Sequence, residues 1–329
     1  MAAQTVQWEH GLLQVKLPLP FALKSVNSYV LTEPAGGYTL IDPGLRTEET
    51  LAAWEEVFAN HSFAPEQITR IVLTHQHPDH YGLAGHFAEL SGAPVLMSRR
   101  AHRYAKRLWG ADSTMTEELA ALFALHGMPQ RYIDEISSNL SSFHEKVSPQ
   151  PLQDQMIYIE AGETLELGGS QWELLDAPGH AYGQLCFYEA SKKWMICGDQ
   201  VLPRITPNIS VMPGEEINPL GDFLASLDHL SEYEVLRAFP GHYDSFTTFA
   251  SRIAEIKQHH VERLEQMLVM LEEPLTGFEV CGRSFGARAQ QSPHQHRFAM
   301  AETLAHLYEL EQSDRISRTE RAGIIYFFK

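Results

Sequence analysis

The sequence of 329 residues predicts an α/β protein built from two sheets. In the first third of the chain, short apolar runs alternate with stretches that are apolar along one helical face, which is typical of strands alternating with helices. Between residues 157 and 197, several short apolar runs follow one another at hairpin spacing and indicate a second sheet. A group of His and Asp residues directly follows one apolar run, as is common at strand ends in layered α/β proteins.

The first part of the chain predicts a hairpin and then alternating elements. Two β-rich runs, 27–32 and 38–41, flank a Pro-Ala-Gly-Gly turn and predict a pair of antiparallel strands. The pattern then predicts, in order, a helix over 47–60, a strand over 70–74, a helix after His80 that ends at Gly92, and a short strand over 94–97.

Residues 99–148 depart from this alternation and predict a helical insertion. Helices are expected over 99–108, 117–126 and 130–143, with an apolar face. The insertion either caps the site or extends the core. As a cap it would shape the substrate pocket, and Met115, Phe123 and Met128 would suit an acyl chain.

The second half predicts a meander and a C-terminal unit. Strands are expected at 157–160, 164–167, 171–175, 184–188, 193–197 and 234–239, with a loop at 204–221 and a helix at 222–230. A long amphipathic helix over 249–273, a short helix near Phe278, a helix over 293–312 and two strands within 315–328 then resemble a small winged-helix unit. We therefore predict a catalytic domain over 1–248 and a C-terminal helical, winged-helix-like unit over 249–329.

Composition narrows the partners. The net charge of −17 disfavours nucleic acid and anionic membrane as partners, and the last helix, over 300–311, carries little positive charge. No apolar run approaches the ~18 residues of a membrane span. The start of the chain lacks the features of a secretory signal. Three cysteines without paired spacing fit a reducing cytoplasm, where we expect the protein. A small-molecule substrate is expected, and the long helix could pair two chains in a homodimer.

The strongest functional signal is a cluster of four potential metal ligands, His75, His77, Asp79 and His80, behind the run Ile71–Leu73. In an extended backbone, alternate residues point the same way, so the first three would converge on one side of the strand end. Imidazole and carboxylate ligands suit zinc, and also iron or manganese. A polar loop that happens to be rich in histidine is the plainer alternative, but such crowded imidazoles are costly unless something binds them.

Four further candidates stand at the carboxyl ends of other apolar runs. They are Asp42, His180, Asp199 and His242, and both histidines belong to a Pro-Gly-His sequence. Glycine lets the backbone turn sharply enough to aim an imidazole inward. Each residue alone reads more simply as part of a turn, and it is their order together with the His75 cluster that indicates a site.

This ordered set resembles the pattern of the metallo-β-lactamase superfamily, over residues from about 10 to 246. The insertion and the C-terminal unit resemble one bacterial branch of it, usually described only as metal-dependent hydrolases. The resemblance implies a four-layer αββα sandwich with the site along one edge of the paired sheets. It implies two divalent metal ions, zinc first and manganese or iron as alternatives, that share a nucleophilic hydroxide.

The resemblance also implies the role of each residue. One metal would take His75, His77 and His180; the second would take Asp79, His80 and His242; and Asp199 would bridge both. Asp42 is expected behind the ligands, where it would orient them. The candidate catalytic residues are Asp79, Asp42 and Tyr182, which either faces the pocket as a donor or steric gate or packs in its loop. His294 and His296 form a second His-x-His without acids and are expected to be surface or packing residues.

Several functions fit this site. The first hypothesis is a metal-dependent hydrolase of a small ester, thioester or lactone. A phosphodiesterase or ribonuclease would need a basic cleft, for which the candidates are Arg99, Arg100, Arg103, Lys106 and Arg107. A mononuclear iron thiol dioxygenase would use a subset of the ligands, and a non-catalytic regulatory protein would not need the intact set.

Overall fold

The computed structural model describes residues 4–141, 143–214, 216–286 and 292–329. Within these ranges the chain first forms a seven-stranded sheet with its strands in sequence order. The strands are β1 (Gln4–Gln7), β2 (Leu12–Pro18), β3 (Ser25–Thr32), β4 (Tyr38–Ile41), β5 (Ile68–Val72), β6 (Val95–Met97) and β7 (Met156–Tyr158). Strands β1 to β4 pair antiparallel and include the predicted hairpin, whereas β4 to β7 pair parallel because helices connect them.

A five-stranded sheet follows in the described part of the chain, as the second run of apolar segments predicted. Its spatial order is β12 (Arg237–Pro240), β11 (Trp194–Gly198), β10 (Leu185–Glu189), β9 (Ser170–Asp176) and β8 (Thr164–Leu167). All neighbours are antiparallel except β11 and β12, which helix α7 (Pro219–Leu230) connects. This helix begins three residues before the predicted start because Pro219 occupies its first turn and Asn218 caps it.

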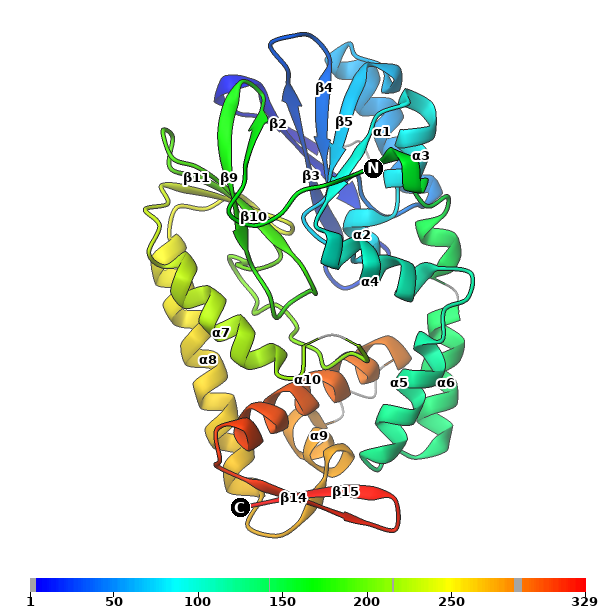
Figure 1. Ribbon diagram of the computed structural model, residues 1–329, viewed down its shortest axis with the longest axis vertical. Helices are drawn as coiled ribbons and strands as arrows, with labels where there is room; N and C mark the ends of the chain where they lie inside the picture. Colours follow the sequence, from blue (N-terminus) through cyan, green and yellow to red (C-terminus); the bar gives the residue numbers. More distant parts are fainter. Residues whose placement is uncertain (1–3, 142, 215, 287–291) are drawn as a thin grey trace.

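The two sheets face each other and are covered by helices on their outer sides (Figure 1). Between them, Tyr29 and Val72 of the first sheet meet Leu174 and Phe187 of the second in one apolar cluster. Helices α1 (Glu48–His61) and α3 (Ala84–Ser91) pack on the outer face of the first sheet. Helices α7 and α8 (Phe249–Met270) pack on the outer face of the second. The predicted four-layer αββα sandwich is confirmed.

The helical insertion both lines the pocket and extends the core. It comprises α4 (Arg99–Trp109), α5 (Met115–Leu125) and α6 (Gln130–Ser141). Helix α4 packs on the first sheet, whereas α5 and α6 pack on the C-terminal unit. The prediction that Phe123 and Met128 face a substrate was wrong, because both are buried in that contact. Met115 does line the pocket described below.

The C-terminal unit is a set of helices beside a small three-stranded sheet. After α8 come β13 (Leu275–Thr276), α9 (Gly277–Phe285), α10 (Pro293–Gln312), β14 (Ser317–Arg321) and β15 (Ile324–Phe328). Helix α10 crosses between α7 and α8 on one side and α6 on the other (Figure 1), so its buried faces contact both the second sheet's helices and the insertion. The division at residue 248 stays a prediction.

Among the described helices, none is long and apolar enough to cross a membrane. The predicted cytoplasmic location and homodimer stay predictions.

Candidate metal centre

The predicted site residues lie at one edge of the paired sheets. Each follows the carboxyl end of a strand: Asp42 after β4, the His75 cluster after β5, His180 after β9, Asp199 after β11 and His242 after β12. The ends of strands in two packed sheets therefore bring together residues that are up to 200 positions apart, since 242 − 42 = 200.

The structure brings all seven predicted ligands together. Their ligand atoms form three overlapping groups, and the atoms within each group lie within 4.8 Å of one another. These groups are His75, His77 and His180; His75, His80 and Asp199; and Asp79, His80 and His242. The first and third match the two trios that the resemblance implied. That these atoms bind metal remains a prediction.

Asp199 lies between the two trios. One carboxylate oxygen is 3.4 Å from His80 Nε2, and the other is 3.2 Å from His242 Nε2 and 3.7 Å from His180 Nε2. A carboxylate in this place can reach cations held by either trio.

The local backbone differs from the extended one predicted through Asp79. The extended stretch ends at His77, because Pro78 starts the one-turn helix α2 (Pro78–Tyr81). As a result, Asp79 and His80 turn toward His242, while His75 and His77 face His180. The change of backbone at Pro78 thus divides one short motif between two groups of ligands.

Asp42 orients two of the imidazoles from behind. One of its oxygens accepts from the Thr74 amide N–H (2.8 Å), and the other accepts from the Thr74 hydroxyl (2.7 Å) and from His80 Nδ1–H (2.9 Å). The Thr74 hydroxyl, whose proton is donated to Asp42, can then accept from His75 Nδ1–H at 2.9 Å. Both rings are thereby held with Nε2 free to accept a cation.

Backbone carbonyls orient two further imidazoles in the same way. His180 Nδ1–H donates to the Asn208 carbonyl (3.0 Å), and His242 Nδ1–H donates to the Ser25 carbonyl (2.7 Å). In the neutral form of each ring, Nε2 is therefore the unprotonated atom.

The donor set fits divalent cations. The Nε2 atoms of His75, His80, His180 and His242 and one oxygen of Asp199 are buried without a hydrogen-bond partner. Buried polar atoms of this kind are costly unless something pairs with them. Imidazole nitrogens and carboxylates converging from several sides are ligands that zinc and similar metals prefer.

The electrostatics of the site also favour cations. Burial, with His180 close by, lowers the pKa of His77 to about 3, and burial likewise lowers the pKa of His75 and His180, so these rings are neutral at pH 7. Burial raises the pKa of Asp199, but the neighbouring imidazoles lower it more, so this carboxyl is ionised. Burial also raises the pKa of Asp79, but the neighbouring His80 and His242 lower it more, so that it falls to about 2.

The same carboxylates act on His80 and His242. Burial lowers the pKa of each ring, but Asp199 and Asp79 raise it more, and the pKa of His242 reaches about 10. The negative charge that holds a proton on these rings is equally able to hold a cation, so metal and protons compete for them.

Glycine at two positions permits this close packing. A Cβ on Gly241 would meet an oxygen of Asp199 and Cε1 of His80. Gly179 has φ +102° and lies against Phe223 of α7, where a Cβ would overlap the helix. Both Pro-Gly-His sequences therefore need their glycine, one for the approach of the ligands and one for the turn.

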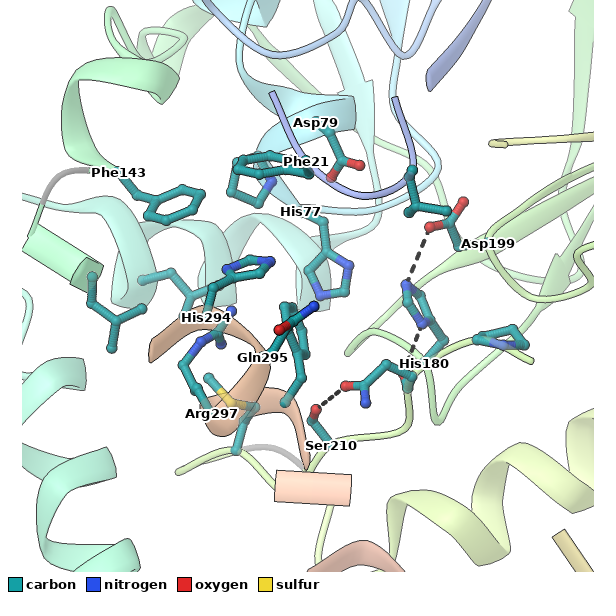
Figure 2. A pocket seen from close by; sticks show the side chains of 18 of the residues that line it. Phe21, His77, Asp79, Phe143, His180, Asp199, Ser210, His294, Gln295 and Arg297 are labelled. Carbon is teal, nitrogen blue, oxygen red and sulfur yellow. Dashed lines mark hydrogen bonds and ion pairs between the residues drawn. The ribbon is translucent and has the colours of Figure 1, made fainter. Parts of the chain in front are cut away.

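A cavity of about 380 Å³ opens beside the ligands. His77, Asp79, His180 and Asp199 line one side of it (Figure 2), and His242 also belongs to its lining. The other walls come from the loop 21–23, the insertion, the loop 202–212 and the start of α10, and they are largely apolar.

Sequence reasoning missed the contribution of α10 to this cavity. His294, which was expected to be a surface or packing residue, lines it together with Gln295, Arg297 and Phe298. The His294 ring stacks on Phe21, with ring centroids 5.3 Å apart. No local signal could have found these residues, because only the tertiary contact of α10 brings them to the cavity. His296 packs as predicted, buried against Tyr132.

Tyr182 is held away from the ligands. Its hydroxyl accepts from the Arg103 guanidinium at 2.9 Å, and its ring lies beside Tyr104. It is not among the described residues that line the cavity. The geometry favours the packing alternative over a donor or gate.

Comparison with known proteins identifies the family. A family model described as the metallo-beta-lactamase superfamily matches residues 22–242, about two thirds of the chain. The chain belongs to the metallo-β-lactamase superfamily. A second model, described as the metallo-beta-lactamase-like C-terminal domain, matches residues 264–329. The predicted family, fold class and activity, that of a metal-dependent hydrolase, are thereby confirmed.

Two relatives resemble this chain over nearly its whole length. The probable metallo-hydrolase YqjP of Bacillus subtilis is 27% identical, over 96% of this chain and 97% of its own. The crystal structure of the metallo-beta-lactamase family protein TTHA1429 from Thermus thermophilus is 33% identical with a TM-score of 0.86, over 97% of this chain and 98% of that one.

More distant relatives cover less of the metallo-hydrolase chain. The hydroxyacylglutathione hydrolase GloC of Haemophilus influenzae is 26% identical over 55% of this chain and 69% of its own. The acyl-coenzyme A thioesterase MBLAC2 of Gallus gallus is 24% identical over 58% of this chain and 62% of its own.

Proposed function

We propose that the protein hydrolyses a small ester, thioester or lactone, with thioesters first, at a centre of two divalent metal ions. The observation that carries the proposal is the pair of ligand trios with Asp199 between them, beside a largely apolar cavity. Two of the distant relatives, the hydroxyacylglutathione hydrolase and the acyl-coenzyme A thioesterase, bear names that describe the hydrolysis of thioesters.

Each residue has a part in this proposal. His75, His77 and His180 would hold one cation, and Asp79, His80 and His242 the second, with Asp199 shared. Zinc is the first candidate, with manganese or iron as alternatives. Two cations held there would lower the pKa of a bound water toward neutral and would offer positive charge to the substrate's carbonyl oxygen. Asp79, whose carboxylate lines the cavity, would accept a hydrogen bond from that water and orient it.

The apolar walls suit an acyl group better than a phosphodiester. Side chains such as Leu108, Trp109, Met115 and Met212 line the cavity and would exclude water around the acyl chain. An acyl substrate of a few carbons fits the volume of about 380 Å³.

The basic residues proposed for a nuclease have other contacts. Arg100 pairs with Asp176, Arg107 pairs with Glu118, and Arg99 stacks on Tyr158. None of the five basic candidates on α4 is among the described residues lining the cavity. We therefore do not favour a phosphodiesterase or ribonuclease.

Metal analysis and turnover together test the proposal. We expect two equivalents of zinc, manganese or iron per chain, and release of thiol from a neutral acyl thioester that stops in chelator and returns with added metal. The matched control is bis-p-nitrophenyl phosphate, which should be cleaved far more slowly. Unchanged turnover in chelator would contradict the proposal, as would a protein that binds a single iron and oxidises thiols.

A further inference from the structure

The cavity contains an unpaired cationic side chain opposite the metal ligands. Arg297, in the first turns of α10, is the only Lys or Arg among the described residues that line it. Its Nε atom is buried without a hydrogen-bond partner, and no ion pair joins its guanidinium to a described residue. An unpaired cation in a largely apolar cavity is destabilising unless an anion joins it.

Two other shielded arginines of this protein have acidic partners. Arg70, with 26% of its side chain exposed, pairs with Glu33 at 3.0 Å. Arg263, with 19% exposed, lies 3.8 Å from Glu302. Arg297 differs from both, because its described contact is the face of the Phe298 ring, 4.2 Å from the guanidinium carbon. A ring face does not satisfy the in-plane N–H groups of a guanidinium.

Two neighbours on the same helix also lack partners. His294 Nδ1 and Gln295 Oε1 are buried without hydrogen bonds. Burial, with Arg297 nearby, lowers the pKa of His294 to about 4, so the ring is neutral at pH 7 and keeps one N–H to donate. The Gln295 amide offers two further N–H donors. Figure 2 shows all three side chains projecting from the same helix, with Gln295 and His294 facing His77.

Capping and ring packing fix the start of α10, so the side chains of His294, Gln295 and Arg297 start from a defined position. The Ser292 hydroxyl accepts from the backbone N–H of Gln295 and caps the helix, and Pro293 occupies its first turn. The His294 ring is held between Phe21 and Phe298. The positive end of the helix dipole adds to the charge of Arg297 at this wall.

We propose that Arg297, with His294 and Gln295, binds an anionic group of the substrate, so that the preferred substrates carry a carboxylate or phosphate remote from the bond that is broken. The proposal rests on the thioester hydrolysis proposed above and specifies its substrate class. The anion belongs either to the acyl half or to the thiol half of the substrate, and in both cases the guanidinium accepts it in the same way.

Matched thioesters test this preference. One pair has a common neutral thiol and acyl chains of equal length, ending in a carboxylate or in a methyl group. A second pair has a common neutral acyl group and thiols with or without a carboxylate. In Arg297→Gln we expect KM for the charged member of one pair to rise about 10- to 100-fold, with kcat little changed and the neutral members within threefold of wild type. Arg297→Lys should recover part of the loss.

Two controls separate binding from folding. Arg103→Gln removes an arginine of α4 that bonds Tyr182 outside the cavity, and it should leave both pairs unchanged. Thermal unfolding should show Arg297→Gln folded. A variant that slows charged and neutral substrates equally, or a wild type without preference in either pair, would overturn the proposal.

A binding measurement keeps the test independent of turnover. Calorimetry would compare thioether analogues, which cannot be hydrolysed, with and without the terminal carboxylate. We expect the carboxylate to tighten binding to wild type and to lose that advantage in Arg297→Gln. If the carboxylate were bound by metal instead, its advantage would survive the substitution and the proposal would fail. If no thioester is hydrolysed, this measurement still decides whether Arg297 binds an anion.

Discussion

The two polar walls of the cavity are built in opposite ways. At the metal centre, the Nδ1 atoms of His75, His80, His180 and His242 are all held by protein partners, and their Nε2 atoms are left without one. At the α10 wall, aromatic rings pack against Arg297 and His294, and the buried atoms Arg297 Nε, His294 Nδ1 and Gln295 Oε1 have no hydrogen-bond partner in the described structure.

This difference indicates that one wall is built to hold metal and the other to bind part of the substrate. Hydrogen bonds from behind fix each imidazole in one direction, which a metal centre needs. Packing against rings fixes the position of α10 side chains but leaves their donors for a ligand. We therefore expect changes at the first wall to alter metal content and every substrate alike, and changes at the second to alter KM for charged substrates alone.

The largest effect is expected from the shared carboxylate. In Asp199→Ala both trios would lose the oxygen ligand that we propose they share, so metal content should fall below two equivalents and turnover should fall at least about a thousandfold. Elemental analysis and thioester kinetics would measure both. Asp228→Ala, which removes an exposed carboxylate paired with Lys257, is the matched control and should change neither. Full metal content in Asp199→Ala would break the comparison at its first wall.

A smaller effect is expected behind the ligands. Asp42→Asn keeps one oxygen but puts an amide NH₂ either against both the Thr74 hydroxyl and His80 Nδ1–H or against the Thr74 backbone N–H, all of which are donors. We expect metal affinity to fall about 10- to 100-fold, measured by competition with a chelator. Thr74→Val removes only the link between Asp42 and His75 and should cost less. Substrate preference should stay the same in both variants, and a changed preference for charged substrates would count against separate walls.

The sequence predicted the residues of the candidate metal centre, but it did not predict the α10 wall. His75, His77, Asp79 and His80 lie within six residues, and the other candidates stand at strand ends, so spacing and order were enough to predict a site. The local geometry at Pro78 was not, because a single helical turn redirected Asp79. Phe123 was assigned to the pocket because helical periodicity identifies an apolar face but not the element that covers it.

The α10 wall was beyond sequence reasoning for a different reason. His294 and Arg297 are more than fifty residues beyond the last metal-ligand candidate, His242, and nothing in their spacing distinguishes them from a solvated helix start. Their position depends on packing of α10 against α6, α7 and α8, which is a tertiary property. Contacts between distant elements thus decide the parts of a site that carry no motif.

A still smaller effect on metal affinity is expected where the two walls are connected. Glu302 of α10 accepts from the Asn208 side chain at 2.7 Å, and the Asn208 carbonyl accepts from His180 Nδ1–H. Glu302→Ala should loosen this loop and reduce metal affinity by up to about tenfold, whereas Glu302→Gln keeps an oxygen for Asn208 and should retain most of it. Glu309→Ala, which releases Asn218 on the same loop farther from the site, is the control. Equal effects of all three substitutions would show that α10 acts on the metal only through overall stability.

The last prediction concerns the stability of the fold and a second group of buried histidines, which burial also keeps neutral. His306 Nδ1–H donates to the Glu302 carbonyl, so its Nε2 accepts from His260 Nδ1–H at 3.1 Å and joins α8 to α10. Burial, together with Arg263 and the neighbouring His259, lowers the pKa of His260 to about 2 and that of His306 to about 4. Near pH 6.5 these two histidines become protonated in the unfolded chain, whereas they stay neutral in the folded protein.

The free energy of unfolding should therefore fall as the pH drops below 6.5, by about 1.4 kcal/mol per pH unit for each of these two rings, and the part due to His306 should end near pH 4. Denaturant unfolding at pH 7, 6 and 5 would measure the slope. In the double variant His260→Phe with His306→Leu, the free energy of unfolding should depend less steeply on pH, because the contribution of both rings is lost. This holds whatever the stability of the variant at pH 7. An unchanged slope would mean that these rings do titrate in the folded protein, and that α10 is not held by a neutral pair.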